Sequence, residues 1–486
     1  MSAHADPHHA RRWPILVVIG VAQLMVVLDI TVVNVALPSA QRDLGFSTLE
    51  RQWIVTAYSL AFGSLLLLGG RIGDLFGRRW TFITGLVGFA LASAIGGAAS
   101  SFGMLVASRA AQGAFGAVLA PSALGLLTTT FTDGAERRRA FGVFSAIAGS
   151  GGAVGLLIGG ALTQLVSWRA CMYVNVAFAI PAALAALRLL VSQPHPDRPA
   201  LDLPGVATAS LGLFTLVYGF SNAETSSWGD PVTIAMLAAS AVLLAAFVAI
   251  ERRSAHPMLP LRIVSDRARG GSYLGVGITG IAIFGAFLFL TYYLQTTKHY
   301  TPIRTGLAFL PMSLTIMASA VAANVRLLRR FGPRPLMTAG MVLGAIGMAW
   351  LAQVTPTSGY LDHVLPALLI MGVGFGNTFA PAIFTATYGV DRHDAGIASA
   401  MVNTMQQVSG AIGASFLSTI FAGAVSSYVR GHAPSAATLD AATVHGYRVS
   451  FWVSAGIFAL GAIVVGSLLP SVRFSPAHAE PAGVAS

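Results

Sequence analysis

Asp29 stands in an almost wholly apolar stretch at residues 28–38, inside the first hydrophobic segment of the chain. An acid in the middle of a membrane-spanning helix costs about 2.5–3.5 kcal/mol on insertion scales, so such residues usually have a function. Burial disfavours a charged carboxylate and a nearby positive charge favours it, so a group under both influences can change its protonation state. We predict that Asp29 carries a proton. The alternative is a structural carboxylate that caps backbone groups or pairs with a buried base.

Arg109 is the expected partner of Asp29. It belongs to the fourth hydrophobic segment, where Arg109, Gln112, Gly113 and Gly116 have the i, i+3, i+4, i+7 spacing of one helix face. Asp29 and Arg109 lie at similar depths when both are counted from the same side of the membrane, so the base can approach the acid. Two roles fit Arg109: it takes part in proton transfer, or it bonds backbone carbonyls and only positions helices.

A short glycine-rich loop, GGRIGDLFGRR at residues 69–79, joins the second and third hydrophobic segments. Glycine permits a tight turn and the close approach of a neighbouring helix. The Asp74 carboxylate can stabilise exposed helix amides and hold arginines in a charge cluster that forms in one conformation and breaks in another. A simple turn would not need four glycines. We therefore predict a conformational gate made by Gly69, Arg71, Gly73, Asp74, Gly77 and Arg78.

The fifth hydrophobic segment carries a row of glycines. Gly151, Gly155 and Gly159 recur every four residues, which makes a ridge of small residues on one helix face. Such a ridge allows close helix packing, and we predict a helix seam there. A further hypothesis is that this seam slides or opens when the protein changes conformation.

Amide and tyrosine side chains interrupt several other apolar segments. They can bind a substrate, or they can satisfy one another across helices at about 0.6 kcal/mol for each bond. An amide-rich lining with a single acid suits a poorly charged or weakly cationic organic molecule. The residues expected to line a substrate cavity are Asn34, Gln112, Tyr292, Gln295, Asn377, Asn403, Gln406 and Gln407.

Sequence patterns for catalysis or metal binding do not accompany these residues. There is no GxxxxGK[ST] phosphate loop, no HExxH and no CxxC. Cys171 is the single cysteine, which excludes an intramolecular disulfide and a paired-cysteine metal site. We expect no enzyme activity, no metal and no cofactor, with a proton gradient as the energy source.

The elements that must position these residues are membrane-spanning helices. Of the 486 residues, 55% are hydrophobic and 10% are charged, whereas soluble domains have about 25% charged residues. About 20 apolar residues span a bilayer. Fourteen segments of this kind are expected at residues 14–37, 53–70, 80–99, 104–130, 139–164, 170–191, 203–222, 231–250, 271–297, 304–326, 334–353, 362–388, 395–424 and 447–470. The prediction is an all-α polytopic membrane protein.

The basic residues predict the orientation of these helices. The net charge is +11, and Lys298 is the only lysine. Arginines gather in alternate loops, such as residues 71–79 and 326–334, whereas the loops around Ser100 and Pro356 have no basic residue. Because basic loops stay in the cytoplasm, both termini are predicted to be cytoplasmic. The charge lies between apolar spans and not in a solvated basic domain, so no nucleic-acid partner is expected.

The two halves of the chain repeat each other. GAVLAP at residues 116–121 recurs as GNTFAP at 376–381, and FGRR at 76–79 has the counterpart FGPR at 331–334, at separations of 260 and 255 residues. Two related halves around a central cavity are a common transporter plan. The predicted organisation is a tail at 1–13, a six-helix bundle at 14–195, two inserted lipid-facing helices at 196–255, a second six-helix bundle at 256–472 and a tail at 473–486.

The chain resembles the Major Facilitator Superfamily, and within it the fourteen-span drug:H⁺ antiporter family of bacterial multidrug and antibiotic exporters. The stretch LDITVVNVALP at residues 28–38 is similar to that family's first-span motif, whose aspartate is linked to proton coupling. Residues 69–79 resemble the superfamily's loop motif, with Asp74 and Arg78 in the gating positions. RAAQG at 109–113 is similar to the fourth-span motif, whose arginine is implicated in proton transfer.

The resemblance extends over nearly the whole chain, with two departures. Residues 149–160 resemble the fifth-span antiporter motif, but Leu156 stands where the family usually has proline. In the second-half copy of the loop, Arg329 stands where the first half has Asp74, so the two halves of the gate differ.

The resemblance implies a proton-driven secondary exporter, a drug/H⁺ antiporter, for small organic compounds that are lipophilic or weakly cationic. The expected location is the bacterial inner membrane, and the expected partners are the lipid bilayer, protons and a small-molecule substrate, with the protein a monomer. One alternative is a proton symporter or uniporter for a small metabolite on the same fold. A non-transporting membrane receptor is disfavoured because both termini are short.

Overall fold

A computed structural model describes residues 11–46, 48–131, 134–191, 202–254, 257–390, 394–433 and 435–471, and all regular structure within these ranges is helical. The predicted tails at 1–13 and 473–486 therefore lie almost wholly outside the described residues. The helices of the first half and the insert are α1 (Arg12–Leu44), α2 (Thr48–Phe76), α3 (Arg78–Gly97), α4 (Phe102–Thr130), α5 (Gly134–Leu165), α6 (Ala170–Leu189), α7 (Leu203–Thr225) and α8 (Pro231–Glu251).

The second half begins with a short helix. Three π-helical turns, labelled η, interrupt or precede its longer helices. The elements are α9 (Leu261–Ser265), α10 (Arg267–Tyr292), η1 (Tyr293–Thr297), α11 (Pro302–Ala322), η2 (Ala323–Leu327), α12 (Leu328–Phe331), α13 (Pro333–Leu351), η3 (Tyr360–Val364), α14 (Leu365–Thr387), α15 (Ala395–Arg430) and α16 (Ala436–Leu468).

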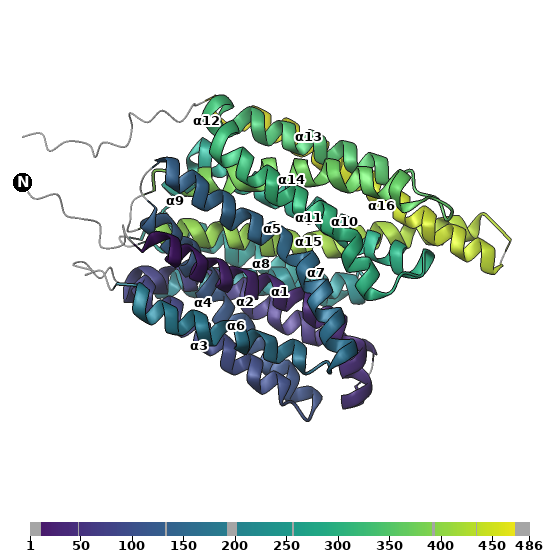
Figure 1. The fold of residues 1–486 in the computed structure, drawn as a ribbon, viewed down its shortest axis with the longest axis horizontal. Helices are drawn as coiled ribbons and strands as arrows, with labels where there is room; N and C mark the ends of the chain where they lie inside the picture. Colours follow the sequence, from purple (N-terminus) through teal and green to yellow (C-terminus); the bar gives the residue numbers. More distant parts are fainter. Residues whose placement is uncertain are drawn as a thin grey trace, which may run out of the picture.

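The predicted all-α polytopic fold is confirmed. Within the described ranges, thirteen helices are long and apolar enough to cross a membrane, and α5, 32 residues long, runs beside them as the fourteenth (Figure 1). The expected segments differ from the helices mainly at their ends: α1 continues to Leu44, and α16 begins at Ala436. A hydropathy window finds only the apolar part of a helix, so polar turns beyond that part are missed.

The internal repeat is visible in the packing. In the first half α4 packs on α2 and α3, and in the second half α14 packs on α11 and α13 in the same way. Gly77 and Gly332, at equivalent turns, have φ angles of 90° and 81°. This left-handed region favours glycine, which explains why both halves keep the glycine of this loop. We call the end of the bundle with these two turns the arginine-rich end.

Helices of the two halves meet closely at the arginine-rich end. There α2 and α4 pack on α15, and α5 packs on α14. The close approach of α5 to α11 needs Gly142, where an added Cβ would lie 3.1 Å from the Val321 Cα. The contact between α5 and α11 continues to the opposite end, where Gly160 lies beside Ile303. By contrast, α1 packs on α4, α5 and α6 of its own half. Apart from α5 and α11, the helices of the first half and those of the second half lie further apart toward the opposite end (Figure 1).

The inserted helices do not both face lipid as expected. Helix α8 packs on α7 and is otherwise largely exposed, which fits the prediction. Helix α7, however, packs between α2 and α15 and so joins the two halves. The Ser415 hydroxyl donates to the Phe220 carbonyl, and the Thr56 and Ser221 hydroxyls lie 3.2 Å apart. The prediction was wrong for this side of α7, because low polarity does not distinguish lipid contact from helix contact.

The glycine seam packs α5 on α1. Gly151 faces Val27, and a Cβ added at Gly159 would lie 2.9 Å from the Cα of Val32. Gly155 faces Thr31, the third α1 residue in this row. The predicted seam is therefore present, but it lies inside the first half. The hypothesis that this seam slides or opens when the protein changes conformation stays a prediction. Helix α5 meets α11 of the other half through other residues, such as Gly142 and Gly160.

We expect Gly159→Ala to destabilise the protein relative to a matched glycine substitution. The added methyl group meets backbone atoms of Val32, which cannot rotate away, and overpacking of this kind costs about 1–3 kcal/mol. Gly423→Ala on α15 is the control, because no atom lies within 4 Å of a Cβ at that position. Thermal unfolding of both variants in the same detergent should give the lower midpoint for Gly159→Ala. Equal midpoints would contradict close packing at the seam.

Candidate functional site

The Asp29 carboxylate lies at the centre of a sealed polar cluster in the first half. It is 0% exposed and receives three hydrogen bonds from side chains of α4 and α6. The donors are Arg109 Nη1 at 2.5 Å, Gln112 Nε2 at 3.0 Å and Asn175 Nδ2 at 2.6 Å. The predicted pairing of Asp29 with Arg109 is present. Three donors to one buried carboxylate stabilise its charged form.

Arg109 has further partners besides Asp29. Its Nη1 also donates to Gln112 Oε1 at 2.8 Å, and its Nε donates to the Ile54 carbonyl at 3.3 Å. The Tyr58 ring lies under the guanidinium, 4.5 Å from ring centroid to Cζ. Neutralisation of Asp29 would therefore leave Arg109 with an amide, a carbonyl and an aromatic face. This matters because an uncompensated buried charge is strongly destabilising.

Asn175 is a member of the cluster that the sequence reasoning missed. It is one asparagine in an otherwise apolar segment, and that isolation was the only signal for it. Asn175 Oδ1 is buried and has no hydrogen-bond partner among the described residues. A rotation of the amide by half a turn would present this oxygen to Asp29. Asn175 can thus donate to a carboxylate or accept from a protonated carboxyl.

Gln112 also belongs to this cluster, which corrects its expected place in a substrate cavity. It is fully buried, and its amide donates to Asp29 and to Ser93 Oγ, the latter at 2.6 Å. The i, i+3 spacing from Arg109 places both side chains on one face of α4, and α1 covers that face. Gln112 is therefore withdrawn from the cavity prediction.

The other residues expected to line a cavity are spread over four helices and the η1 turn. Asn34 and Tyr292 are exposed, and Gln295, Gln406 and Gln407 are half-buried. The two remaining amides are buried and bond within their own helices: Asn377 donates to the Val373 carbonyl, and Asn403 to the Ser399 carbonyl. Hydrogen bonds that would join these seven residues to one another are not found among the described residues, so their shared role stays a prediction.

Asp74, which is predicted to belong to a gate, connects the two halves. Its Oδ1 accepts the backbone N–H of Gly396, at the start of α15, at 3.2 Å and Arg78 Nη2 at 2.9 Å. The carboxylate thus lies at the N-terminus of a helix from the other half, where backbone amides and the helix dipole favour negative charge. The approach needs glycine, since a Cβ at residue 396 would lie 2.5 Å from Asp74 Oδ1.

Other loop residues have packing roles around Asp74. Gly69 lies directly against the backbone of Ala117, and Gly73 lies near Ser122. Arg71, expected as a partner of Asp74, is buried and lies close enough to Glu251 of α8 for an electrostatic interaction. Of the two arginines considered as Asp74 partners, Arg78 makes the contact.

Arg137 is a second connection between the halves that the sequence reasoning did not identify. It lies in α5, and its Nη2 donates to the Thr387 carbonyl at the end of α14 at 2.8 Å. Its guanidinium also lies over the Phe384 and Tyr388 rings of the second half, 5.7 and 5.8 Å from the centroids. In sequence it was one of several arginines in a basic loop, and nothing distinguished it.

Comparisons with known proteins show the family to which this chain belongs. The family model described as Major Facilitator Superfamily matches residues 19–414. The chain is 49% identical to the puromycin resistance protein pur8 of Streptomyces alboniger, over 97% of this chain and 94% of that protein. It is 37% identical to the cephamycin export protein CmcT of Amycolatopsis lactamdurans, over 96% of this chain and 94% of that protein.

Solved structures give the same fold. The human organic anion transporter MFSD10 (TETRAN) superimposes with a TM-score of 0.63 at 15% identity, over 94% of this chain and 99% of that one. The chain is a multi-pass membrane transporter and not an enzyme, and it belongs to the Major Facilitator Superfamily. Within this superfamily it is related to bacterial drug and antibiotic resistance and export proteins.

Proposed function

We propose that the chain is a proton-driven exporter of small organic compounds, antibiotics among them, with Asp29 as the proton-coupling carboxylate. The observation that carries the proposal is a fully buried carboxylate held by three donors, one of them a buried arginine. An ionisable group in such a place is costly and is typical of proton relays. The relationship to resistance and export proteins supports the choice of cargo.

We also propose that the arginine-rich end is cytoplasmic, in a bacterial inner membrane, with six-helix bundles at 14–195 and 256–472 and the protein active as a monomer. The basic loops favour this orientation. The conformation described above is then closed toward the cytoplasm through Asp74, Gly396 and Arg137. Transport would require this closure to open and the opposite end to close.

The proposed mechanism begins with protonation of Asp29 from outside. A protonated carboxyl cannot hold three donors as the carboxylate does, so its contacts with α4 and α6 must change. Helix α1 packs on α5, and α5 packs on α11 of the other half, so a shift of α1 reaches the interface between the halves. The proton acts by stabilising one of two conformations more than the other, which is the only way a ligand can shift their equilibrium.

Transport in proteoliposomes tests this function. Purified protein would be reconstituted with puromycin as the first substrate, chosen because a relative 49% identical is a puromycin resistance protein. An imposed pH gradient should drive puromycin against its concentration gradient, with protons moving in the opposite direction. A protonophore should stop this transport. Protons moving with the substrate would indicate the symport alternative, and transport unaffected by the gradient would indicate a uniporter.

Asn175→Leu is expected to move the pH profile of transport upward. The charged carboxylate loses a charge-assisted hydrogen bond, which is about twice as strong as the neutral bond that the protonated carboxyl can make to the same amide. Protonated Asp29 is therefore favoured, and the pH of half-maximal transport should rise by about half a unit to one unit. The measurement is transport rate against pH.

Asn222→Leu is the matched control for this change. Asn222 also donates an amide hydrogen bond to a carboxylate, Asp230 Oδ2 at 2.8 Å, but in the inserted helices and away from Asp29. Its pH profile should match that of the unaltered protein. An unchanged pH profile in Asn175→Leu, or an equal shift in both variants, would contradict a role of Asn175 in the proton site.

A further inference from the structure

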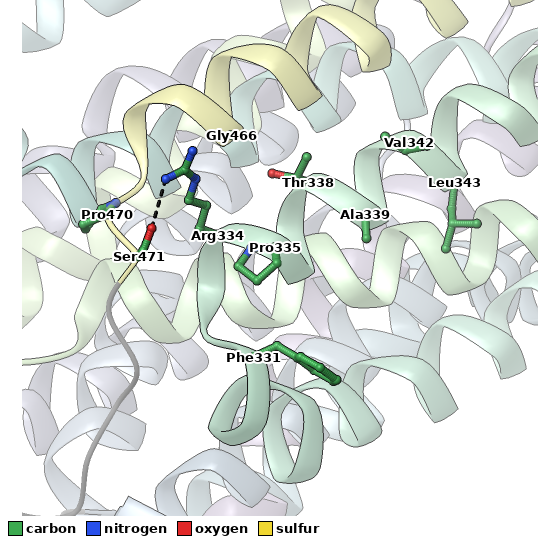
Figure 2. Close-up of a pocket in the computed structure, with 10 residues that line it drawn as sticks. All are labelled: Phe331, Arg334, Pro335, Thr338, Ala339, Val342, Leu343, Gly466, Pro470 and Ser471. Carbon is green, nitrogen blue, oxygen red and sulfur yellow. Dashed lines mark hydrogen bonds between the residues drawn. The ribbon is translucent and has the colours of Figure 1, made fainter.

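A groove opens on the outer surface of the second half, between the start of α13 and the end of α16 (Figure 2). Its volume is about 880 Å³, within the range of about 300–1,000 Å³ that is typical of small-molecule sites. All its lining residues belong to the second half, from Phe331 to Leu343 and from Gly466 to Ser471. The groove is therefore separate from the contact between the halves and from the Asp29 cluster.

The depth of the groove matches one leaflet of a bilayer. Arg334 lies at its mouth and Leu343 at its far end, nine residues further along α13, which is about 14 Å at 1.5 Å per residue. Half of a hydrocarbon core is about 15 Å. The deeper wall is apolar, with Ala339, Val342 and Leu343 along one helix (Figure 2). This shape suits a chain of methylene groups that runs from the membrane surface toward the midplane.

Arg334 brings positive charge to the mouth of the groove, and three further arginines precede it closely in the chain. Arg326, Arg329, Arg330 and Arg334 are all exposed, and none makes an ion pair in the part of the chain that the structure describes. The sequence has no acidic residue from 267 to 361. In the equivalent first-half turn, Arg78 has Asp74 as its partner.

Two polar groups are placed at successive depths in the groove. Arg334 Nη1 donates to Ser471 Oγ at 3.0 Å, which holds the guanidinium at the mouth. Thr338 lies one turn, about 6 Å, deeper, and its buried Oγ1 has no partner among the described residues. Gly466 lies directly beside this hydroxyl, since a Cβ at that position would lie 3.3 Å from the Thr338 Oγ1. Figure 2 shows the Thr338 oxygen directed toward Arg334.

We propose that this groove binds an anionic phospholipid. The phosphate lies against Arg334 and the neighbouring arginines, the glycerol ester accepts a hydrogen bond from Thr338, and an acyl chain fills the apolar part of the groove. Basic pockets between transmembrane helices are suited to anionic headgroups. The lipid site does not depend on the proposed transport function. Only its assignment to the cytoplasmic leaflet rests on the proposed orientation.

Native mass spectrometry of the full-length protein in detergent tests the proposal. Phosphatidylglycerol and phosphatidylcholine with identical acyl chains would be titrated separately. The protein should bind phosphatidylglycerol more tightly, and Arg334→Gln should weaken that binding about fivefold, as expected for one basic residue near an anionic lipid. Arg188→Gln, an exposed arginine at the same end of the first half, is the control and should bind as the unaltered protein does.

A second pair of variants tests the acyl chain. Ala339→Trp fills the groove and leaves Arg334 in place, so it should weaken phosphatidylglycerol binding by a similar factor. Leu91→Trp puts the same side chain on an exposed apolar face of α3 and should have no effect. Equal binding of the two lipids, equal losses in Arg334→Gln and Arg188→Gln, or unchanged binding in Ala339→Trp would each overturn the proposal.

Discussion

Asp29→Asn is expected to abolish gradient-driven transport while the substrate still equilibrates across the membrane. Asparagine has nearly the same shape as aspartate but cannot take up or release a proton. The variant therefore resembles protein that is permanently protonated at this position. Arg109 keeps the Gln112 oxygen, the Ile54 carbonyl and the Tyr58 ring as partners, so its charge is not left without compensation and the fold is expected to persist.

The size of this effect follows from the energy in the gradient. A difference of about two pH units is worth about 2.7 kcal/mol for each proton, or about a hundredfold in substrate concentration for one-to-one exchange. Coupled transport through Asp29 should give an accumulation of this order in proteoliposomes. The Asp29→Asn variant should lose this accumulation completely, and the substrate should reach equal concentrations on both sides of the membrane.

Asp43→Asn is the matched control, because it makes the same chemical change on the same helix. Asp43 is about half exposed and pairs with Arg169 at the end of α1. Accumulation should be unchanged in this variant. If Asp29→Asn protein still accumulates substrate when a gradient is imposed, the proton is carried elsewhere and the coupling role of Asp29 is wrong. Folding of each variant would be checked by thermal unfolding in detergent.

The sequence was sufficient to predict the helices and the central charge pair. The expected segments match the helices because apolar length is the dominant signal in a membrane protein. Asp29 and Arg109 were predicted to meet because buried charges require partners and both lie at the same depth. The contact at 2.5 Å agrees with that argument. Gly77 and Gly332 share a left-handed φ, which agrees with the repeat.

Contacts between distant elements were not predictable in the same way. The contacts of Asn175, of Arg137 and of the packed side of α7 each depend on which helices become neighbours. Hydropathy does not carry that information. Gln112 illustrates the limit: its place on the Arg109 face was correct, but a helix face can meet another helix or a cavity, and α1 covers this one.

The cross-half contact of Asp74 predicts the second large effect. The carboxylate sits at the N-terminus of α15 and accepts the Gly396 N–H, so it acts as a cap supplied by the other half of the molecule. A negative charge in a partly buried site at a helix N-terminus contributes up to about 2 kcal/mol. That energy is present only while the arginine-rich end is closed. We therefore expect Asp74 to favour the closed conformation over the open one at this end.

Asp74→Asn should increase the exposure of residues that the closure covers. A loss of about 1.4 kcal/mol changes a two-state equilibrium about tenfold. Thr387→Cys provides the reporter, since this residue is fully buried beneath Arg137 at the interface, in a background where Cys171→Ser removes the natural thiol. With Asp74→Asn added, a maleimide that cannot cross membranes should label Cys introduced at this position about tenfold faster from the arginine-rich side.

Two further variants separate the cap from other effects of charge. Gly396→Ala leaves the charge intact but places a methyl group 2.5 Å from the Asp74 carboxylate, so it should also accelerate labelling. Asp394→Asn removes a carboxylate at the same end of α15, but that group pairs with Arg262 inside the second half, so labelling should stay slow. Slow labelling in both Asp74→Asn and Gly396→Ala would mean that Arg137 and the helix packing hold this end closed without Asp74. Fast labelling in all three variants would indicate general loosening of α15.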